Sequence, residues 1–188
     1  MKMDVYDRIP VMESEKFLLR EIKEDMDAED LLKVYSDEAA VPLFNSDNCV
    51  NGFHYVSLEE MKNTIEFWKK EYQKRYYVRW AVIDKNVDRA VGTIELFNRK
   101  ANDYFNHCGL LRLDLRSNYE RQADIEDILT IIVANVKELF ACDKIATKAI
   151  PIAKERIKAL GNIGFHLSEE YVIGHDGTKY GFYYIMEV

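Results

Sequence analysis

The segment Cys108–Phe140, with the sequence CGLLRLDLRSNYERQADIEDILTIIVANVKELF, decides the fold because its hydrophobic period changes partway along. Within Cys108–Leu115, leucines alternate with polar residues from Leu111 to Leu115, as in a strand that has one apolar face. From Ile125 to Phe140, apolar residues recur at helical spacing, which is typical of an amphipathic helix. The segment therefore predicts a strand that runs into a long helix.

The residues before this segment predict further strands and two helices. Ser57 followed by Glu60 has the form of a capping box, which marks the start of a helix. After that helix the period changes to two, which predicts a meander of three strands that ends with Cys108–Leu115. The expected elements are a strand at Phe17–Glu21, a helix at Asp27–Tyr35, a mobile loop at Asp37–Gly52, a helix from Ser57 to about Arg75, and strands at Val78–Ile83 and Ala90–Phe97.

The residues after the segment predict that the sheet continues to the end of the chain. We expect a strand at Lys144–Ile150, a short helix at Ala153–Leu160, and a closing hairpin formed by Leu167–Gly174 and Phe182–Val188. The fold class is then α/β (α+β), with a mixed central β-sheet of about seven strands and helices on both faces. No linker or repeat interrupts this order, so residues 1–188 are expected to form a single domain.

Composition narrows the class of protein. The chain has 188 residues, a formal net charge of −7 and 48% hydrophobic residues, which excludes a disordered chain and argues against nucleic-acid or anionic-membrane partners. No apolar run approaches the ~18 residues of a membrane span, and no signal peptide opens the sequence. Three cysteines lie far apart without metal-ligand spacing, so we expect a reduced, cytoplasmic protein that holds no metal.

Several short sequences, taken with this order of elements, resemble the GNAT (GCN5-related N-acetyltransferase) superfamily. They are Leu18–Ile22, Val91–Leu96, Leu111–Leu115 followed by Asn118 and Tyr119, and Asn162–Phe165 with its late Gly-Phe turn. The branch that the chain resembles most acetylates ribosomal-protein N-termini and other small amines. The resemblance implies acetyl-CoA as co-substrate and covers the chain from about residue 15 to Val188.

The resemblance also implies which residues hold the cofactor. In this family the strand that corresponds to Cys108–Leu115 pairs through its backbone with pantetheine, and the following helix presents N–H groups to the pyrophosphate. The residues implied are Leu113 and Leu115 on the strand and Arg121, Gln122, Ala123, Asp124 and Ile125 at the start of the helix.

The loop before this helix departs from the family pattern Q/R-x-x-G-x-G/A. Glu120, Ala123 and Ile125 stand at the three signature positions. Residues 119–127 contain four acids against Arg121 alone, a local net charge of −3. Acids close to a phosphate repel it, whereas in the first turn of a helix they stabilise the helix itself. We therefore expect a degenerate cofactor loop, and weak or absent acetyl-CoA binding stays open as the alternative to acetyl-CoA as co-substrate.

Glu95 and Asp114 are the candidate catalytic residues. If the strands that carry them are neighbours in a meander, Glu95 lies nearly opposite Arg112. Either carboxylate could take a proton from an ammonium substrate through a water molecule. Alternatively, Glu95 and Arg112 form a structural salt bridge.

Two functions stay open from the sequence. The first is transfer of an acetyl group from acetyl-CoA to a primary amine of a small molecule or peptide. The second is a binding or regulatory module that keeps the GNAT fold and has lost transfer activity. No GxGxxG, GxSxG or HExxH motif favours an oxidoreductase or a hydrolase. The sequence does not identify the acceptor, and it leaves open whether the chain forms a homodimer.

Overall fold

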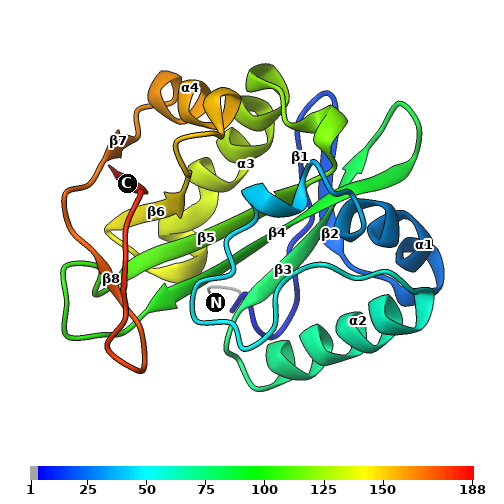
Figure 1. Ribbon diagram of the computed structural model, residues 1–188, viewed down its shortest axis with the longest axis horizontal. Coiled ribbons are helices and arrows are strands. Elements are labelled where there is room, and N and C mark those ends of the chain that lie inside the picture. Colours follow the sequence, from blue (N-terminus) through cyan, green and yellow to red (C-terminus); the bar gives the residue numbers. More distant parts are fainter. Residues whose placement is uncertain (1–3) are drawn as a thin grey trace.

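The computed structural model describes residues 4–188 and contains a mixed eight-stranded sheet in the order β1-β2-β3-β4-β5-β6-β10-β7 (Figure 1). A separate two-stranded sheet pairs β8 with β9. The strands are β1 (Met12–Glu13), β2 (Phe17–Glu21), β3 (Val78–Asp84), β4 (Arg89–Arg99), β5 (Cys108–Leu115), β6 (Lys144–Lys148), β7 (His166–Leu167), β8 (Val172–Ile173), β9 (Lys179–Tyr180) and β10 (Tyr183–Glu187). The α-helices are α1 (Glu24–Tyr35), α2 (Leu58–Gln73), α3 (Gln122–Phe140) and α4 (Lys154–Asn162).

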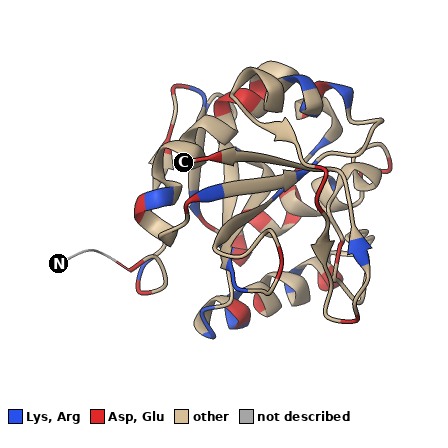
Figure 2. Cartoon of the chain, turned by 90° about the vertical axis from the view of Figure 1, so that its left-hand side faces the viewer, with Lys and Arg blue, Asp and Glu red and all other residues tan. Residues whose placement is uncertain are grey.

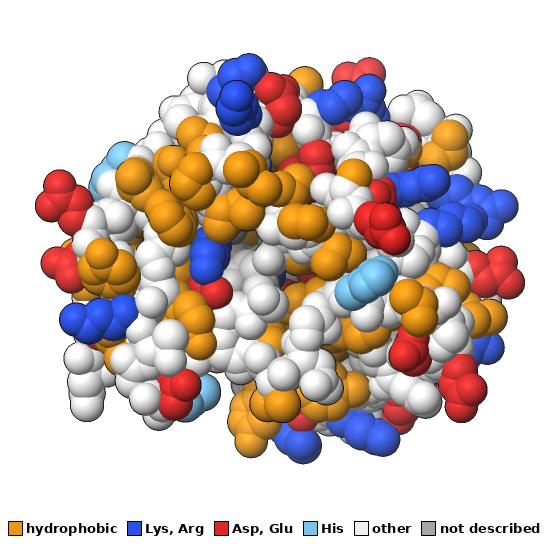
Figure 3. Space-filling model, in the orientation of Figure 1, with side chains coloured by type: hydrophobic (Ala, Val, Ile, Leu, Met, Phe, Trp, Pro, Cys, Tyr) orange, Lys and Arg blue, Asp and Glu red, His pale blue; other side chains and the backbone are white. Residues whose placement is uncertain are grey.

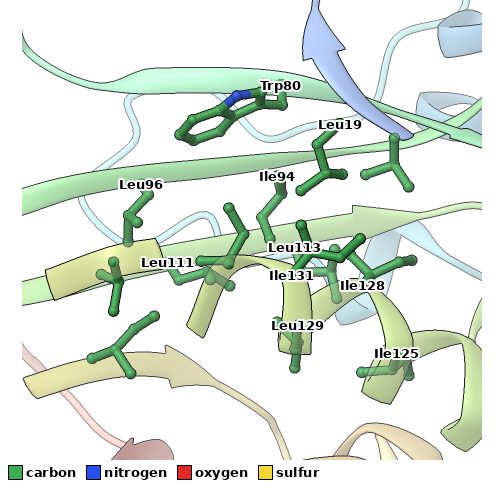
Figure 4. Close-up of a cluster of buried hydrophobic side chains, with 14 of the residues drawn as sticks. Leu19, Trp80, Ile94, Leu96, Leu111, Leu113, Ile125, Ile128, Leu129 and Ile131 are labelled. Atoms are coloured by element: carbon green, nitrogen blue, oxygen red, sulfur yellow. The ribbon is translucent and has the colours of Figure 1, made fainter. Parts of the chain in front are cut away.

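The helices cover both faces of the main sheet, as the sequence predicts (Figure 1). On one face, α3 and α4 pack on the apolar side of the strands, and Leu111, Leu113, Ile128 and Ile131 lie between them (Figure 4). On the other face, α1 and α2 enclose a second core. The capping box at Ser57 and Glu60 opens α2 as expected. The predicted mixed fold is therefore confirmed.

The predicted closing hairpin is present, but it is less regular than expected. Its two arms pair antiparallel through β7 and β10, while β8 pairs with β9 in a separate small sheet nearer the tip. β10 also pairs with β6, which buries Tyr183 and Ile185 and joins the hairpin to the main sheet.

β5 and β6 are paired over only part of the length of β5. The parallel pairing of the two strands covers Cys108–Leu111 against Lys144–Thr147 and then stops, while β5 continues to Leu115. After β6 the chain no longer pairs with β5. The N–H of Ala149 bonds to the carbonyl of Phe182 instead, and Pro151 has no N–H to donate. One edge of Arg112–Leu115 thus extends beyond its neighbour.

Acidic and basic residues are interspersed along the helices (Figure 2). Within residues 4–188, none of the helices combines the length and the apolar character that crossing a bilayer requires.

Candidate active site

Three charged residues lie in one row across the middle of the main sheet. Glu95 on β4 is opposite Arg79 on β3 and opposite Arg112 on β5. The guanidinium of Arg79 is 2.5 Å from the Glu95 carboxylate, and that of Arg112 is 3.1 Å from it. The predicted pairing of Glu95 with Arg112 is confirmed, and Arg79 is a further member that the sequence analysis missed.

The neighbouring row holds Asp114, the second candidate catalytic residue. The hydroxyl of Tyr35 on α1 donates a hydrogen bond of 2.8 Å to the Asp114 carboxylate. Arg79 links the rows, because its guanidinium donates to Thr93 at 2.9 Å and lies 3.2 Å from Asp114. Burial raises the pKa of Tyr35 well above its ordinary value, so the phenol stays protonated and acts as a donor.

Glu95 keeps its charge although it is only 1% exposed. Burial by itself raises the pKa of a carboxyl, but the charges of Arg79 and Arg112 outweigh it and hold the pKa of Glu95 below its ordinary value. The guanidinium of Arg79 also stacks over the ring of Trp68 at 4.3 Å. The arrangement therefore fixes an ionised carboxylate in the interior of the sheet.

A cavity of about 640 Å³ gives access to this row, and both Glu95 and Arg112 line it. Its other walls come from Tyr76 and Tyr77 after α2, from residues 97–103 at the end of β4, and from residues 172–175 around β8. In the space-filling view the surface is hollowed near the middle of this face (Figure 3). Asp114 is fully buried and lies outside the lining, so the structure brings only one of the two candidates to the cavity.

Asp47 ties the segment between α1 and α2 to the rim of the same cavity. Its carboxylate accepts hydrogen bonds from Lys148 at 2.7 Å and from the Tyr183 hydroxyl at 3.0 Å. Its carbonyl accepts a bond of 2.7 Å from Arg112. The part of the predicted mobile loop that contains Asp47 is therefore anchored to β5, β6 and β10.

The strand residues implied for the cofactor lie at the opening of the sheet. The side chains of Leu113 and Leu115 are buried in the α3 core, and the backbone of this part of β5 extends past β6. The backbone, rather than the side chains, is what this edge offers to a ligand.

The helix residues implied for the cofactor are spread around the start of α3. Ile125 is fully buried in the core, so its side chain does not occupy the exposed first turn. Asp124 is bound by Lys16 at 2.5 Å and by Arg121 at 2.8 Å. Gln122 donates its backbone N–H to the Glu155 carboxylate at 3.3 Å, and Ala123 is exposed.

Cations from distant segments neutralise the acids that the sequence analysis counted here. Glu120 forms an ion pair with Arg156, a residue of α4 that is 2% exposed, and Asp124 takes Lys16 from the turn before β2. The local count of −3 over residues 119–127 therefore overstated the negative charge at this place. Lys16 and Arg156 could not be found from the loop sequence, because their partners lie 108 and 36 positions away.

At the start of α3, an open strand edge lies beside a first helical turn that is partly occupied by the chain's own carboxylates. The open edge of β5 suits an extended ligand, but the first N–H of the helix already carries the carboxylate of Glu155. The Glu120–Arg156 pair joins the same loop to α4. Within residues 4–188, no group of three or more His, Cys, Asp or Glu side chains is arranged to hold a metal ion.

Comparison with known proteins agrees with this fold. Residues 16–166 match the family described as the acetyltransferase (GNAT) domain. The chain belongs to this family of acetyltransferases. Among curated proteins, none matches it in sequence.

Solved structures with the same fold include two described as ribosomal-protein acetyltransferases. One, described as a ribosomal-protein-serine acetyltransferase from Vibrio cholerae, has a TM-score of 0.73 at 14% identity and covers 99% of this chain and 100% of its own. The ribosomal-protein-S5-alanine acetyltransferase from Vibrio fischeri has a TM-score of 0.69 at 17% identity, over 95% of this chain and 96% of its own.

A third relative was solved with ligands. The microcin C7 self-immunity acetyltransferase MccE, in complex with acetyl-CoA and AMP, has a TM-score of 0.67 at 14% identity, over 93% of this chain and 94% of its own. At such identities these likenesses show the shared fold alone.

Proposed function

We propose that this chain is an N-acetyltransferase that transfers an acetyl group from acetyl-CoA to a primary amine of a small molecule or peptide. Membership of the GNAT family supports the reaction class. The observation that carries the acceptor side is the cavity lined by Glu95 and Arg112, because it leads from the surface to an ionised, buried carboxylate.

The role of Glu95 follows from the proton that an amine must lose before it can attack a carbonyl. A primary amine is an ammonium ion at neutral pH, and the fixed negative charge of Glu95 attracts and orients it. The low pKa of Glu95 makes it a weak base, so its main contribution in this proposal is to hold the ammonium ion, whose proton leaves through a water molecule. Asp114 has no direct path to the cavity and orients Arg79, which in turn holds Glu95.

A second candidate function is a GNAT-fold binding or regulatory module with weak or no acetyl-CoA binding. One observation favours it: the first turn of α3 is capped by Glu155, and its loop is tied to α4 by the Glu120–Arg156 pair. Both contacts place carboxylates of the chain itself close to the first turn of α3.

Thermal unfolding with and without acetyl-CoA separates the two functions. A ligand at ~100 times its dissociation constant stabilises a protein by roughly 2.7 kcal/mol, which is a shift of several degrees in Tm. We expect such a shift for the wild type, together with acetyl-CoA-dependent acetylation of amines supplied as a mixture and detected by mass spectrometry. No shift at millimolar acetyl-CoA would contradict the transferase and support the module.

A further inference from the structure

A second cavity lies where the end of β2, the start of α1 and the helix α2 meet. Its volume is about 460 Å³, and Arg79 of β3 lines it together with side chains from these three elements. No described residue lines both this cavity and the acceptor cavity, so the two are separate spaces. Cavities of this size hold small organic molecules in other proteins.

The most buried residues of the wall show what the base of this cavity offers. Ile65 and Trp68 of α2 are each 5% exposed, and Arg79 is 4% exposed. The half-buried side chains of Ile22 and Tyr72 extend this apolar and aromatic surface. A ligand with a flat apolar body therefore fits the base, because burying its surface against these side chains is favourable.

Arg79 brings one unused hydrogen-bond donor to this wall. Its terminal nitrogens donate to Thr93, Asp114 and Glu95. Its Nε, by contrast, is buried and has no hydrogen-bond acceptor among residues 4–188. Leaving a buried donor unpaired is unfavourable, so an acceptor oxygen that enters from the cavity and reaches Nε is stabilised there. The atom is closed to solvent, so half-buried side chains of the wall, such as Tyr72, must move aside to admit the oxygen.

Charge decides which kind of oxygen suits this donor. Arg79 and Arg112 are balanced by Glu95 and Asp114 in the buried cluster, so no positive charge is left over for an anion. At the mouth of the cavity, acids outnumber bases. The charged lining residues there are Glu21, Glu24, Asp25 and Glu66 against Lys23 and Lys69. This excess of negative charge repels a carboxylate and leaves a neutral carbonyl unaffected.

We propose that this cavity is a second ligand site, which takes a small uncharged molecule with a flat apolar body and a carbonyl oxygen that accepts from Nε of Arg79. Trp68, whose ring already stacks on the Arg79 guanidinium, supplies the apolar contact. The site goes beyond the proposed transferase activity and does not depend on it. It shares no lining residue with the acceptor cavity and contains none of the residues implied for the cofactor.

The probes for the test are naphthamide and naphthoate, which share one ring system and differ in charge. NMR of the indole N–H groups locates binding, because the chain has two tryptophans, Trp68 in the cavity wall and Trp80 in the core on the other face of the sheet. We expect naphthamide to shift the Trp68 signal and to leave the Trp80 signal in place. Naphthoate should bind at least about tenfold more weakly, because the acids at the mouth repel it.

Ile22→Trp is the blocking variant, because replacing Arg79 itself would disturb the buried charge cluster. Ile22 is half-buried in the cavity wall, so a larger ring at this position takes up part of the base. We expect naphthamide to bind this variant at least about tenfold more weakly by calorimetry. Val87→Trp, at an exposed position in the turn between β3 and β4, is the matched control and should bind the probe like the wild type. Thermal unfolding checks that both variants fold.

The double variant Glu21→Gln/Asp25→Asn tests the charge argument. Both residues are exposed at the mouth of the cavity, and their amides keep the size of the side chains and remove two negative charges. We expect naphthoate to bind more tightly to this variant than to the wild type, and naphthamide to bind both proteins equally.

An unchanged Trp68 signal at millimolar naphthamide would overturn the proposal. Equal binding of the two probes to the wild type would also overturn it, because the oxygen would then be assigned wrongly. Unchanged naphthamide binding in Ile22→Trp would show that the probe binds elsewhere. A preference for the amide that is lost in Ile22→Trp and kept in Val87→Trp supports the site, whatever an acetylation assay shows.

Discussion

At the scale of single residues, the centre of the molecule is organised by Arg79. Its side chain contacts the two candidate carboxylates, Glu95 and Asp114, and it is 4% exposed. Arg112 completes the balance, so two cations face two anions and the cluster is neutral. A buried charge is tolerated only when it is paired and hydrogen-bonded, and each member of this cluster depends on the others for that.

Replacement of Glu95 by Gln should lower stability and flatten its dependence on pH. Removing one partner of a buried ion pair costs about 3–5 kcal/mol at pH 7. The folded-state pKa of Glu95 lies below its unfolded value, so its ionisation contributes stability that is present above the unfolded pKa and is lost as pH falls through the folded pKa. Urea unfolding at pH 7 and at pH 4 measures both effects, and the loss between these pH values should be smaller in the variant.

The exposed Glu13, paired with Lys85 on the surface, supplies the control for this experiment. Glu13→Gln should change the free energy of unfolding by no more than about 0.5 kcal/mol. A Glu95→Gln protein with the stability and the acid sensitivity of the wild type would show that the buried row does not hold the sheet together.

Sequence reasoning reached residues that are related by a regular pattern and missed those that are related only in space. Alternation along two neighbouring strands placed Glu95 opposite Arg112. Arg79 stands in a strand that is buried throughout, where an apolar residue is the common choice, so no local signal marks it as part of the site. Glu155 lies 33 positions from Gln122, and no loop motif contains it.

At the scale of elements, α3 was predictable because its pattern is long and strong, whereas the division of the C-terminal hairpin into short strands was not. The helix begins three residues before Ile125 and ends at Phe140 as expected. β7, β8 and β9 have two residues each, too short for alternation to show which partner each takes. Their pairing is decided by the burial of β10 against β6, which is a tertiary effect.

The apolar stripe of α3 gives the prediction at this scale. Ile132 is 1% exposed in the core between α3 and the sheet, so Ile132→Asp buries an unpaired carboxylate at a cost of several kcal/mol. We expect the variant to be unfolded or molten by circular dichroism and by the width of its thermal transition. Ala134→Asp, at an exposed position of the same helix, should stay folded. A cooperative transition for Ile132→Asp near that of the wild type would contradict the assigned helix face.

At the scale of the whole molecule, one sheet separates two cores and belongs to both. β3 shows this most clearly, because Val78, Trp80 and Val82 face the α3 side while Ala81 and Ile83 face the α1–α2 side. The buried ion pairs of Glu95 with Arg79 and Arg112 link β3, β4 and β5. Asp47 joins the segment between α1 and α2 to β5, β6 and β10. Neither core can lose its strands without opening the other.

The two tryptophans of the chain make this coupling measurable, because Trp80 lies in the α3 core and Trp68 in the α1–α2 core. Trp68→Phe and Trp80→Phe each leave one fluorescent reporter on one side of the sheet. We expect each single-tryptophan protein to give one urea midpoint that coincides with the midpoint from far-ultraviolet circular dichroism, as a cooperative unit requires. Adding Ile65→Ala on the α2 side should cost about 2–5 kcal/mol and shift the transition reported by Trp80 by the same amount as that reported by Trp68. An unchanged urea midpoint at Trp80 in the Ile65→Ala variant would mean that the sheet does not transmit stability between its faces. The acceptor cavity and the start of α3 would then belong to units that unfold separately.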